Sequence, residues 1–133
     1  MKDLLLIGGS GFLGRKLIQE LGRQRVLSTY FKNKSEDGVY FDFADPNLQN
    51  IVSQHQNLKY AIISGGVIDF GRIRENPSFA RYINVDCVEK IISELATLGI
   101  TPIFISSESV FDGTKGNYTE ANLPNPQIEY AKQ

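Results

Sequence analysis

Cysteine, tryptophan, methionine and histidine are nearly absent from the sequence. It contains one cysteine (Cys87), one methionine, one histidine and no tryptophan. A single cysteine cannot form an internal disulfide, which fits a reducing compartment, so a cytoplasmic location is expected. Cys87 itself is expected to be a small buried residue on a helix rather than a catalytic thiol.

The sequence also has no long apolar run and no excess of one charge sign. No segment approaches the roughly 18 apolar residues of a membrane-spanning helix, and the N-terminus lacks a signal-peptide layout. Lys and Arg number 14 against 15 Asp and Glu, for a net charge of −1, and the signs are mixed along the chain. Neither nucleic acid nor a membrane is therefore an expected partner. The 133 residues suffice for one domain and are too few for two.

Glycine, in contrast, is concentrated near the N-terminus, where four glycines fall within residues 8–14. They follow the apolar run 4–7, which is typical of a strand buried on both faces, and a helical pattern then extends to Leu21. Strand, glycine turn and helix bring a phosphate against backbone N–H groups at a helix N-terminus. The spacing predicts a dinucleotide-binding turn with contacts at Gly8, Gly11, Phe12, Leu13 and Gly14.

A P-loop is the main alternative to this interpretation, because Gly9 and Gly14 also bracket four residues. That motif requires Lys and then Ser or Thr directly after the second glycine, and the sequence has Arg15-Lys16-Leu17. No hydroxyl is placed for Mg²⁺, which excludes the P-loop. The alternative that stays open is a glycine-rich turn that binds nothing.

Further strands and helices are expected to alternate along the chain. The strands are predicted at residues 25–29, 39–41, 60–63 and 101–105. A short helix is expected to start at Pro46 under a cap from Asp45, a long one to run from Pro77 to Gly99, and a last one to begin near Gln127. This alternation predicts an α/β fold with a Rossmann-type doubly wound, mostly parallel sheet, whose ligands bind at the carboxyl ends of the strands.

The segment after the second strand bears on which dinucleotide is bound. NAD sites usually place Asp or Glu there to accept hydrogen bonds from the ribose, but residues 21–35 contain no acidic residue. Thr29 and Lys32, together with Ser28 and Lys34, suit a 2′-phosphate instead. The predicted cofactor is therefore NADP(H). The alternative is that both lysines are solvated loop charges.

Other candidate cofactor contacts follow the third and fourth predicted strands. Asp42 and Phe43 are placed to contact the adenine, although Asp42 could equally be a turn residue. Ser64 and Gly65 lie at the same edge of the sheet and are expected to line the cleft. No metal-ligand set is recognisable, and His55 is expected to be exposed.

Motifs late in the sequence carry a family resemblance. They are residues 106–113 (Ser-Ser-Glu-Ser-Val-Phe-Asp-Gly), residues 118–120 (Tyr-Thr-Glu) and Tyr130. With the glycine turn, they resemble the extended short-chain dehydrogenase/reductases, and among these the dTDP-4-dehydrorhamnose reductases, over the whole chain. The resemblance implies reduction of a nucleotide-linked 4-keto sugar by NADP(H) in polysaccharide biosynthesis. The oligomeric state is left open, with a homodimer as the state to test.

By this resemblance Tyr130 would protonate the sugar C4 oxygen and Ser107 would hydrogen-bond that oxygen. Asn84 matches an Asn that helps hold the family's catalytic site. Free tyrosine has a pKa of about 10, and the family lowers it with a Lys four residues after the Tyr. Here that position lies just beyond Gln133, and Lys132 would point about 200° away on a helix.

The sequence is therefore expected to correspond to the N-terminal half of the family's proteins. Residues 1–133 would form a partial NADP(H)-binding domain, with an incomplete sheet, no C-terminal substrate-binding region and no activity by itself. Glu108 and Ser109 replace the family's Asp and Tyr, and residues 64–66 replace Asn-Ala-Ala, which leaves the sugar open. Two further functions stay open: a related nucleotide-sugar epimerase or dehydratase, and a non-catalytic NADP-binding regulatory subunit.

Overall fold

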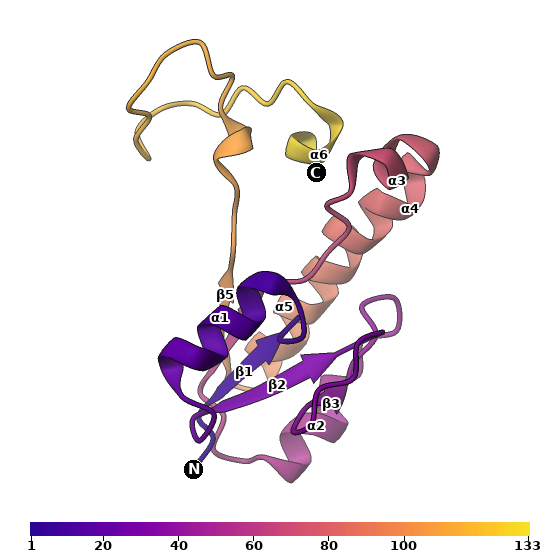
Figure 1. Ribbon diagram of the computed structural model, residues 1–133, viewed down its shortest axis with the longest axis vertical. Helices are drawn as coiled ribbons and strands as arrows, with labels where there is room; N and C mark the ends of the chain where they lie inside the picture. The colour runs from indigo at the N-terminus through magenta and orange to yellow at the C-terminus, as the bar shows by residue number, and fades with distance from the viewer.

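The computed structural model describes all of residues 1–133, and its centre is one five-stranded sheet (Figure 1). All neighbouring strands are parallel and lie in the order β3-β2-β1-β4-β5. The strands are β1 (Leu4–Ile7), β2 (Val26–Tyr30), β3 (Val39–Tyr40), β4 (Tyr60–Ile63) and β5 (Thr101–Phe104). The structure confirms the predicted doubly wound α/β fold.

Strand β1 is the middle of the sheet, and all four of its residues are buried. Side chains alternate between the two faces of a strand. Leu5 and Ile7 therefore join the core on one face, while Leu4 and Leu6 join a smaller cluster on the other. A strand covered on both faces needs a continuous apolar run, which explains why β1 was recognisable from sequence.

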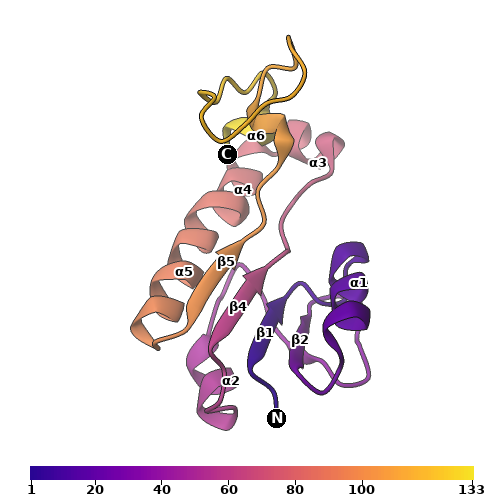
Figure 2. The same cartoon turned by 90° about the vertical axis from the view of Figure 1, so that its left-hand side faces the viewer.

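Helices cover both faces of the sheet, as Figure 2 shows. Helix α1 (Phe12–Leu21) packs on one face through Leu17, Ile18 and Leu21. Helices α2 (Leu48–Gln54) and α5 (Val88–Thr97) lie on the other and contribute residues such as Leu48 and Ile91 to the larger core. None of the helices is both long and apolar enough to span a membrane.

The long helix predicted from Pro77 to Gly99 is present, but its turns are not uniform. It comprises α4 (Pro77–Arg81), a π-helical segment (Tyr82–Cys87) and α5, with Asn76 accepting a hydrogen bond from Phe79 N at its start. Gly99 follows its end with φ +72°, a conformation that favours glycine. The π-helical segment has no signature in the hydrophobic spacing, so the sequence did not indicate it.

Two local features differ from expectation. Helix α3 (Phe70–Glu75), capped by Asp69, was not predicted because it is short and half of its residues are polar. Helix α2 begins later than expected and is capped by Asn47 rather than Asp45, so the predicted cap was wrong. The last helix, α6 (Glu129–Lys132), lies close to its expected position.

A carboxylate from a distant helix completes the cap of α2. Glu94 Oε1, on α5, accepts hydrogen bonds from Leu48 N (3.0 Å) and Gln49 N (3.1 Å). The first N–H groups of a helix have no partner within the helix, so this side chain satisfies two of them. Negative charge is also favourable at that end of the helix dipole.

We expect Glu94→Ala to lower the free energy of unfolding by about 1 kcal/mol, because it removes a helix cap. Glu94→Gln keeps an acceptor oxygen and should lose less. Urea denaturation of both variants measures the effect. Glu89→Ala, at an exposed position of the same helix, is the matched control. Equal stabilities for Glu94→Ala and this control would contradict the assigned cap.

The segment that follows β5 leaves the sheet and extends beyond the carboxyl ends of the strands (Figures 1 and 2). It has little regular structure apart from the 3-10 turn Glu108–Val110 and helix α6. Helix α6 contacts both this turn and helix α3. The segment therefore brings residues 107–110 and 129–132 together above the sheet.

Candidate functional site

The glycine turn after β1 is stabilised by β2. Gly8 has φ +92°, and its N–H donates to Thr29 Oγ1 at 3.1 Å. Thr29 O also accepts a hydrogen bond from Ser10 N at 3.3 Å, and the Thr29 residue is only 1% exposed. The structure therefore places Thr29 beneath the turn, where it fixes the position of the glycines.

Three backbone N–H groups at the start of α1 have no acceptor in the chain. They belong to Phe12, Leu13 and Gly14, and the N-cap residue Gly11 has no side chain that could accept from them. Gly11 N instead donates to Gly8 O at 3.0 Å. Free N–H groups and the positive end of the helix dipole together form a site for an anion such as a pyrophosphate.

The loops after β1, β3 and β4 meet closely beside this turn. A Cβ on Gly8 would lie 2.9 Å from Gly65 N, and a Cβ on Gly65 would lie 2.6 Å from the Phe43 ring. Ser64 Oγ donates to Ile7 O at 3.1 Å, which fastens the β4 loop to β1. The predicted cofactor residues Gly8, Phe43, Ser64 and Gly65 are therefore brought into one region.

Asp42 forms a local turn. Its Oδ1 accepts a hydrogen bond from Ala44 N at 2.9 Å, a common Asx geometry. Phe43 lies between these two residues and packs edge-to-face on Phe41, with ring centroids 5.7 Å apart. The turn function that the sequence left open for Asp42 is thus present, and it holds Phe43 against Gly65.

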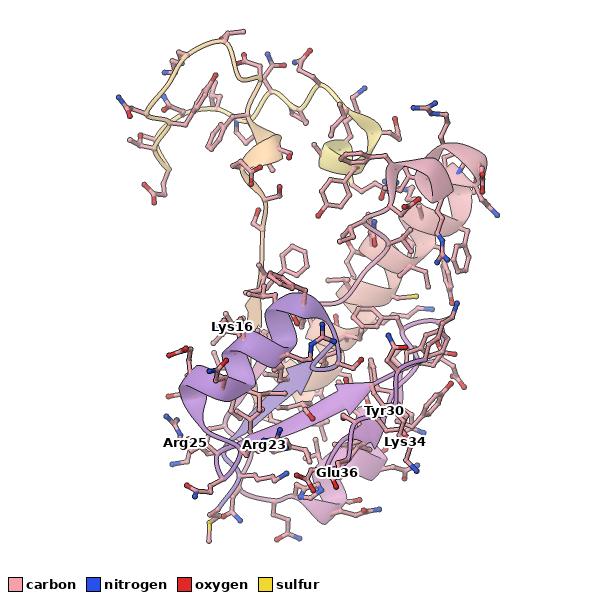
Figure 3. All side chains as sticks on the ribbon, in the orientation of Figure 1. Lys16, Arg23, Arg25, Tyr30, Lys34 and Glu36 are labelled. Carbon is pink, nitrogen blue, oxygen red and sulfur yellow. The ribbon has the colours of Figure 1, made fainter.

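A charged cleft of about 390 Å³ lies between α1 and the loop that joins β2 to β3. Its basic lining residues are Lys2, Arg15, Arg23 and Lys34, and its acidic ones are Glu36 and Asp37. Arg23 Nη1 lies 3.7 Å from Asp37 Oδ2, and in Figure 3 Arg23 and Lys34 lie on either side of Glu36. The cleft also contains Gly9, Ser10 and Ser28, so it is continuous with the glycine turn.

The two predicted phosphate-binding lysines are placed differently. Lys34 lines the cleft, whereas Lys32 is not among its lining residues and has its Nζ 5.9 Å from the centre of the Phe31 ring. Arg15, which no sequence motif indicated, lines the cleft and donates from Nη1 to Ser10 O at 2.8 Å. Of the two predicted lysines only Lys34 therefore lines the cleft, and Arg15 lines it as well and contacts the glycine turn.

Ser107 begins the 3-10 turn after β5. Its Oγ accepts a hydrogen bond from Ser109 N at 3.2 Å and donates to Glu108 Oε2 at 3.3 Å. The side chain is half-buried, so its hydroxyl is constrained but reachable. A substrate oxygen that replaced Glu108 as acceptor would accept the same hydrogen bond.

Tyr130 lies on α6, which contacts the turn that Ser107 begins. Its ring packs edge-to-face on Phe70 of α3, with centroids 6.1 Å apart. Its hydroxyl has no hydrogen-bond partner in the chain, which leaves it free for a ligand. The structure thus places the two predicted catalytic residues on contacting elements, and Phe70 supports the tyrosine ring.

Asn84 connects this region to the β4 loop. Its Oδ1 accepts from Val67 N at 2.7 Å, and its Nδ2 donates to Val67 O and to Gln133 Oε1, both at 2.8 Å. All the polar groups of the amide are thus used within the protein. Asn84 fastens the end of α6 to the loop that contains Ser64 and Gly65.

The loop between Ser107 and Tyr130 is organised around Asp112. The carboxylate accepts hydrogen bonds from Tyr118 Oη, from Thr114 N and Oγ1, and from Asn125 Nδ2. These hydrogen bonds, of which the one from Tyr118 has the largest effect, hold the pKa of Asp112 well below its usual range. Asn125 N also donates to Val110 O at 2.9 Å, so the Val-Phe-Asp-Gly and Tyr-Thr-Glu motifs form one internally bonded loop.

Comparison with known proteins places this arrangement in a family. The model of the RmlD substrate binding domain matches residues 1–133, the whole of the chain. The chain belongs to this family. The RmlD match agrees with the resemblance predicted from the late motifs, and it covers both the glycine turn and the segment that carries Ser107 and Tyr130.

Relatives of this RmlD-family chain include a methionine adenosyltransferase subunit and a hypothetical reductase. The methionine adenosyltransferase 2 subunit beta of Bos taurus is 29% identical over 98% of the chain and 40% of that protein. A hypothetical dTDP-4-dehydrorhamnose reductase from Sulfolobus tokodaii superposes with a TM-score of 0.86 at 29% identity, over 98% of this chain and 48% of that one. The chain thus spans less than half the length of both.

The fold is also shared by a protein of lower identity. The UDP-glucose 4-epimerase from Brucella ovis, solved in complex with NAD, superposes with a TM-score of 0.79 at 19% identity, over 99% of this chain and 44% of that one. At this identity the likeness concerns the fold alone.

Proposed function

We propose that the chain is the dinucleotide-binding domain of an NADP(H)-dependent reductase that acts on a nucleotide-linked 4-keto sugar. The contact between α6, which carries Tyr130, and the turn that begins at Ser107 carries the proposal. These residues lie beyond the carboxyl ends of parallel strands, where ligands of such sheets bind. Similarity to the Sulfolobus tokodaii reductase supports the same reaction class.

The residues at the glycine turn fit a dinucleotide. The free N–H groups of Phe12, Leu13 and Gly14 would bind the pyrophosphate, and Arg15 with Lys34 would bind a 2′-phosphate. Phe43 and Gly65 would form the wall beside the adenine. When bound, the cofactor supplies the hydride for reduction.

Ser107 and Tyr130 would act on the carbonyl oxygen of the sugar. The Ser107 hydroxyl donates a hydrogen bond to that oxygen, which polarises the C4 carbonyl toward attack. Reduction of the carbonyl would place negative charge on that oxygen. The Tyr130 hydroxyl then gives its proton to this oxygen, and the product is an alcohol.

We expect Lys34→Gln to lower the affinity for NADP⁺ about tenfold and to leave the affinity for NAD⁺ unchanged, because it removes one charge-assisted bond to the 2′-phosphate. Isothermal titration calorimetry of the chain with both dinucleotides measures the ratio. Lys32→Gln, in the same loop, tests the other predicted lysine and should have a smaller effect, since Lys32 lies over Phe31.

Lys16→Gln is the control for this experiment. Lys16 lies on the exposed side of α1, and its Nζ donates to Gln19 Oε1 at 3.2 Å. It carries the same charge near the same turn but does not line the cleft. An equal loss for Lys16→Gln and Lys34→Gln would show a nonspecific effect of charge. A preference of the native chain for NAD⁺ would contradict the proposed cofactor and favour a related epimerase.

A regulatory role is the second candidate, and the similarity to methionine adenosyltransferase 2 subunit beta favours it. In that case the chain would bind NADP(H) and a catalytic partner without reducing a sugar. Association of the complete gene product with a methionine adenosyltransferase, measured by analytical ultracentrifugation, tests this role. Binding together with no turnover of any nucleotide-linked keto sugar would displace the reductase proposal.

A further inference from the structure

The π-helical segment Tyr82–Cys87 contacts two of the loops at the carboxyl edge of the sheet. Tyr82 Oη donates to Ala44 O at 3.1 Å, in the loop after β3. Asn84 exchanges two hydrogen bonds with Val67, in the loop after β4. Side chains two residues apart lie roughly half a turn apart around a helix, so one segment can reach loops on both of its flanks.

The contact from Tyr82 completes the fixation of Ala44. The N–H of Ala44 donates a hydrogen bond to Asp42 Oδ1 at 2.9 Å, and the carbonyl of Ala44 accepts one from the Tyr82 hydroxyl. Ala44, which follows Phe43, is thus held by hydrogen bonds at both its N–H and its carbonyl. The Phe43 ring packs against Phe41 and Gly65. Movement of Ala44 would displace the Phe43 ring from Gly65.

The environment of Tyr82 keeps its hydroxyl protonated. Interaction with the side chain of Cys87, together with burial and the charges of Asp45 and Asp86, raises the pKa of Tyr82 above its ordinary value. A protonated phenol can donate, and Ala44 O is the acceptor that it reaches. The ring itself lies 5.7 Å from Lys90 Nζ, a contact that does not involve the hydroxyl.

We propose that Tyr82 is a positioning residue for the adenine side of the dinucleotide site: its hydroxyl holds Ala44 and thereby the Phe43 ring against Gly65. This inference rests on the proposed dinucleotide function of the glycine turn and of the loops beside it. Tyr82 touches no ligand in this scheme. It acts through Ala44, and its effect should be confined to the part of the cofactor that Phe43 contacts.

The test is Tyr82→Phe, which removes the hydroxyl and keeps the ring. Calorimetry of the 133-residue chain should show about fivefold weaker binding of NADP⁺ and of 2′,5′-ADP, the fragment that carries the adenine. Amide hydrogen exchange in the ligand-free chain should accelerate at Phe43, Ala44 and Asp45. Exchange at Val67, which Asn84 holds, should stay unchanged, a pattern that general destabilisation would not produce.

Lys90→Gln is the matched control, because it removes the cation near the same ring and leaves the hydroxyl in place. It should change neither binding nor exchange. If the native chain binds no dinucleotide, the proposed function fails. If it binds and Tyr82→Phe binds equally well, or if Tyr82→Phe does not fold, the positioning role fails and the dinucleotide site stands.

Discussion

Replacing Gly14 by alanine should destabilise the chain by about 2 kcal/mol and weaken dinucleotide binding at least tenfold. A Cβ on this residue would lie 2.4 Å from Gly8 O and 2.6 Å from Gly9 Cα. Both atoms belong to the backbone, so neither can move away as a flexible side chain could. The glycine turn would have to separate from α1, and its free N–H groups would lose their arrangement.

The expected loss of stability is informative because helix propensity alone predicts a gain. Gly14 lies inside α1, where alanine is intrinsically more favourable than glycine by about 1 kcal/mol. We expect the steric cost to exceed this gain, since overpacking at a rigid site costs about 1–3 kcal/mol. Chemical denaturation gives the stability, and titration with NADP⁺ gives the affinity.

Gly116→Ala is the control for Gly14→Ala. A Cβ on Gly116 would meet nothing within 4 Å, so this substitution adds a methyl group without a clash. It should leave both stability and binding close to their native values. A Gly14→Ala chain that is as stable as the native chain and binds NADP⁺ equally would contradict the assigned contact between turn and helix.

Tyr130→Phe should reduce the turnover of a nucleotide-linked keto sugar by the complete gene product by about 10²- to 10⁴-fold. This is the usual contribution of a positioned general acid. The ring would keep its packing on Phe70, so the fold and the KM should change little. Steady-state kinetics with NADPH and a 4-keto sugar nucleotide separate the two parameters.

Tyr60→Phe is the matched control, because Tyr60 is an exposed tyrosine at the beginning of β4, the end opposite the glycine turn. Removal of the Tyr60 hydroxyl should leave kcat unchanged. Native-like turnover by Tyr130→Phe would remove this residue from the mechanism. Absence of turnover by the native protein, in the presence of tight NADP⁺ binding, would instead favour the regulatory role that the methionine adenosyltransferase relatives suggest.

Much of the fold could be predicted from local patterns. The buried run Leu4–Ile7, the glycines that follow it and the helical spacing between Pro77 and Gly99 each mark an element within a short stretch of sequence. Helix α3 was not predicted because six residues of mixed polarity give no recognisable hydrophobic period. The cap of α2 was misassigned because Asp45 and Asn47 are both suitable residues, and propensity alone does not choose between them.

The candidate site was predicted less completely than the fold. The residue types and strand ends indicated Gly8, Phe43 and Gly65, and the family resemblance indicated Ser107 and Tyr130. The structure shows how the elements that carry them meet. Sequence spacing gave no way to rank Lys32 against Lys34, because the loop after β2 has no period. Only the path that this loop takes along α1 places Lys34, together with Arg15, in the cleft.

The sequence by itself determined the order of strands and helices, the glycine turn and the family, because each follows from residues close together in the chain or from ordered motifs. The tertiary structure decided which distant groups meet: Glu94 with the start of α2, Tyr82 with Ala44, and Asn84 with both Val67 and Gln133. These pairs are 17 to 49 residues apart. Their contacts depend on how helices pack on the sheet, and no local periodicity encodes that packing.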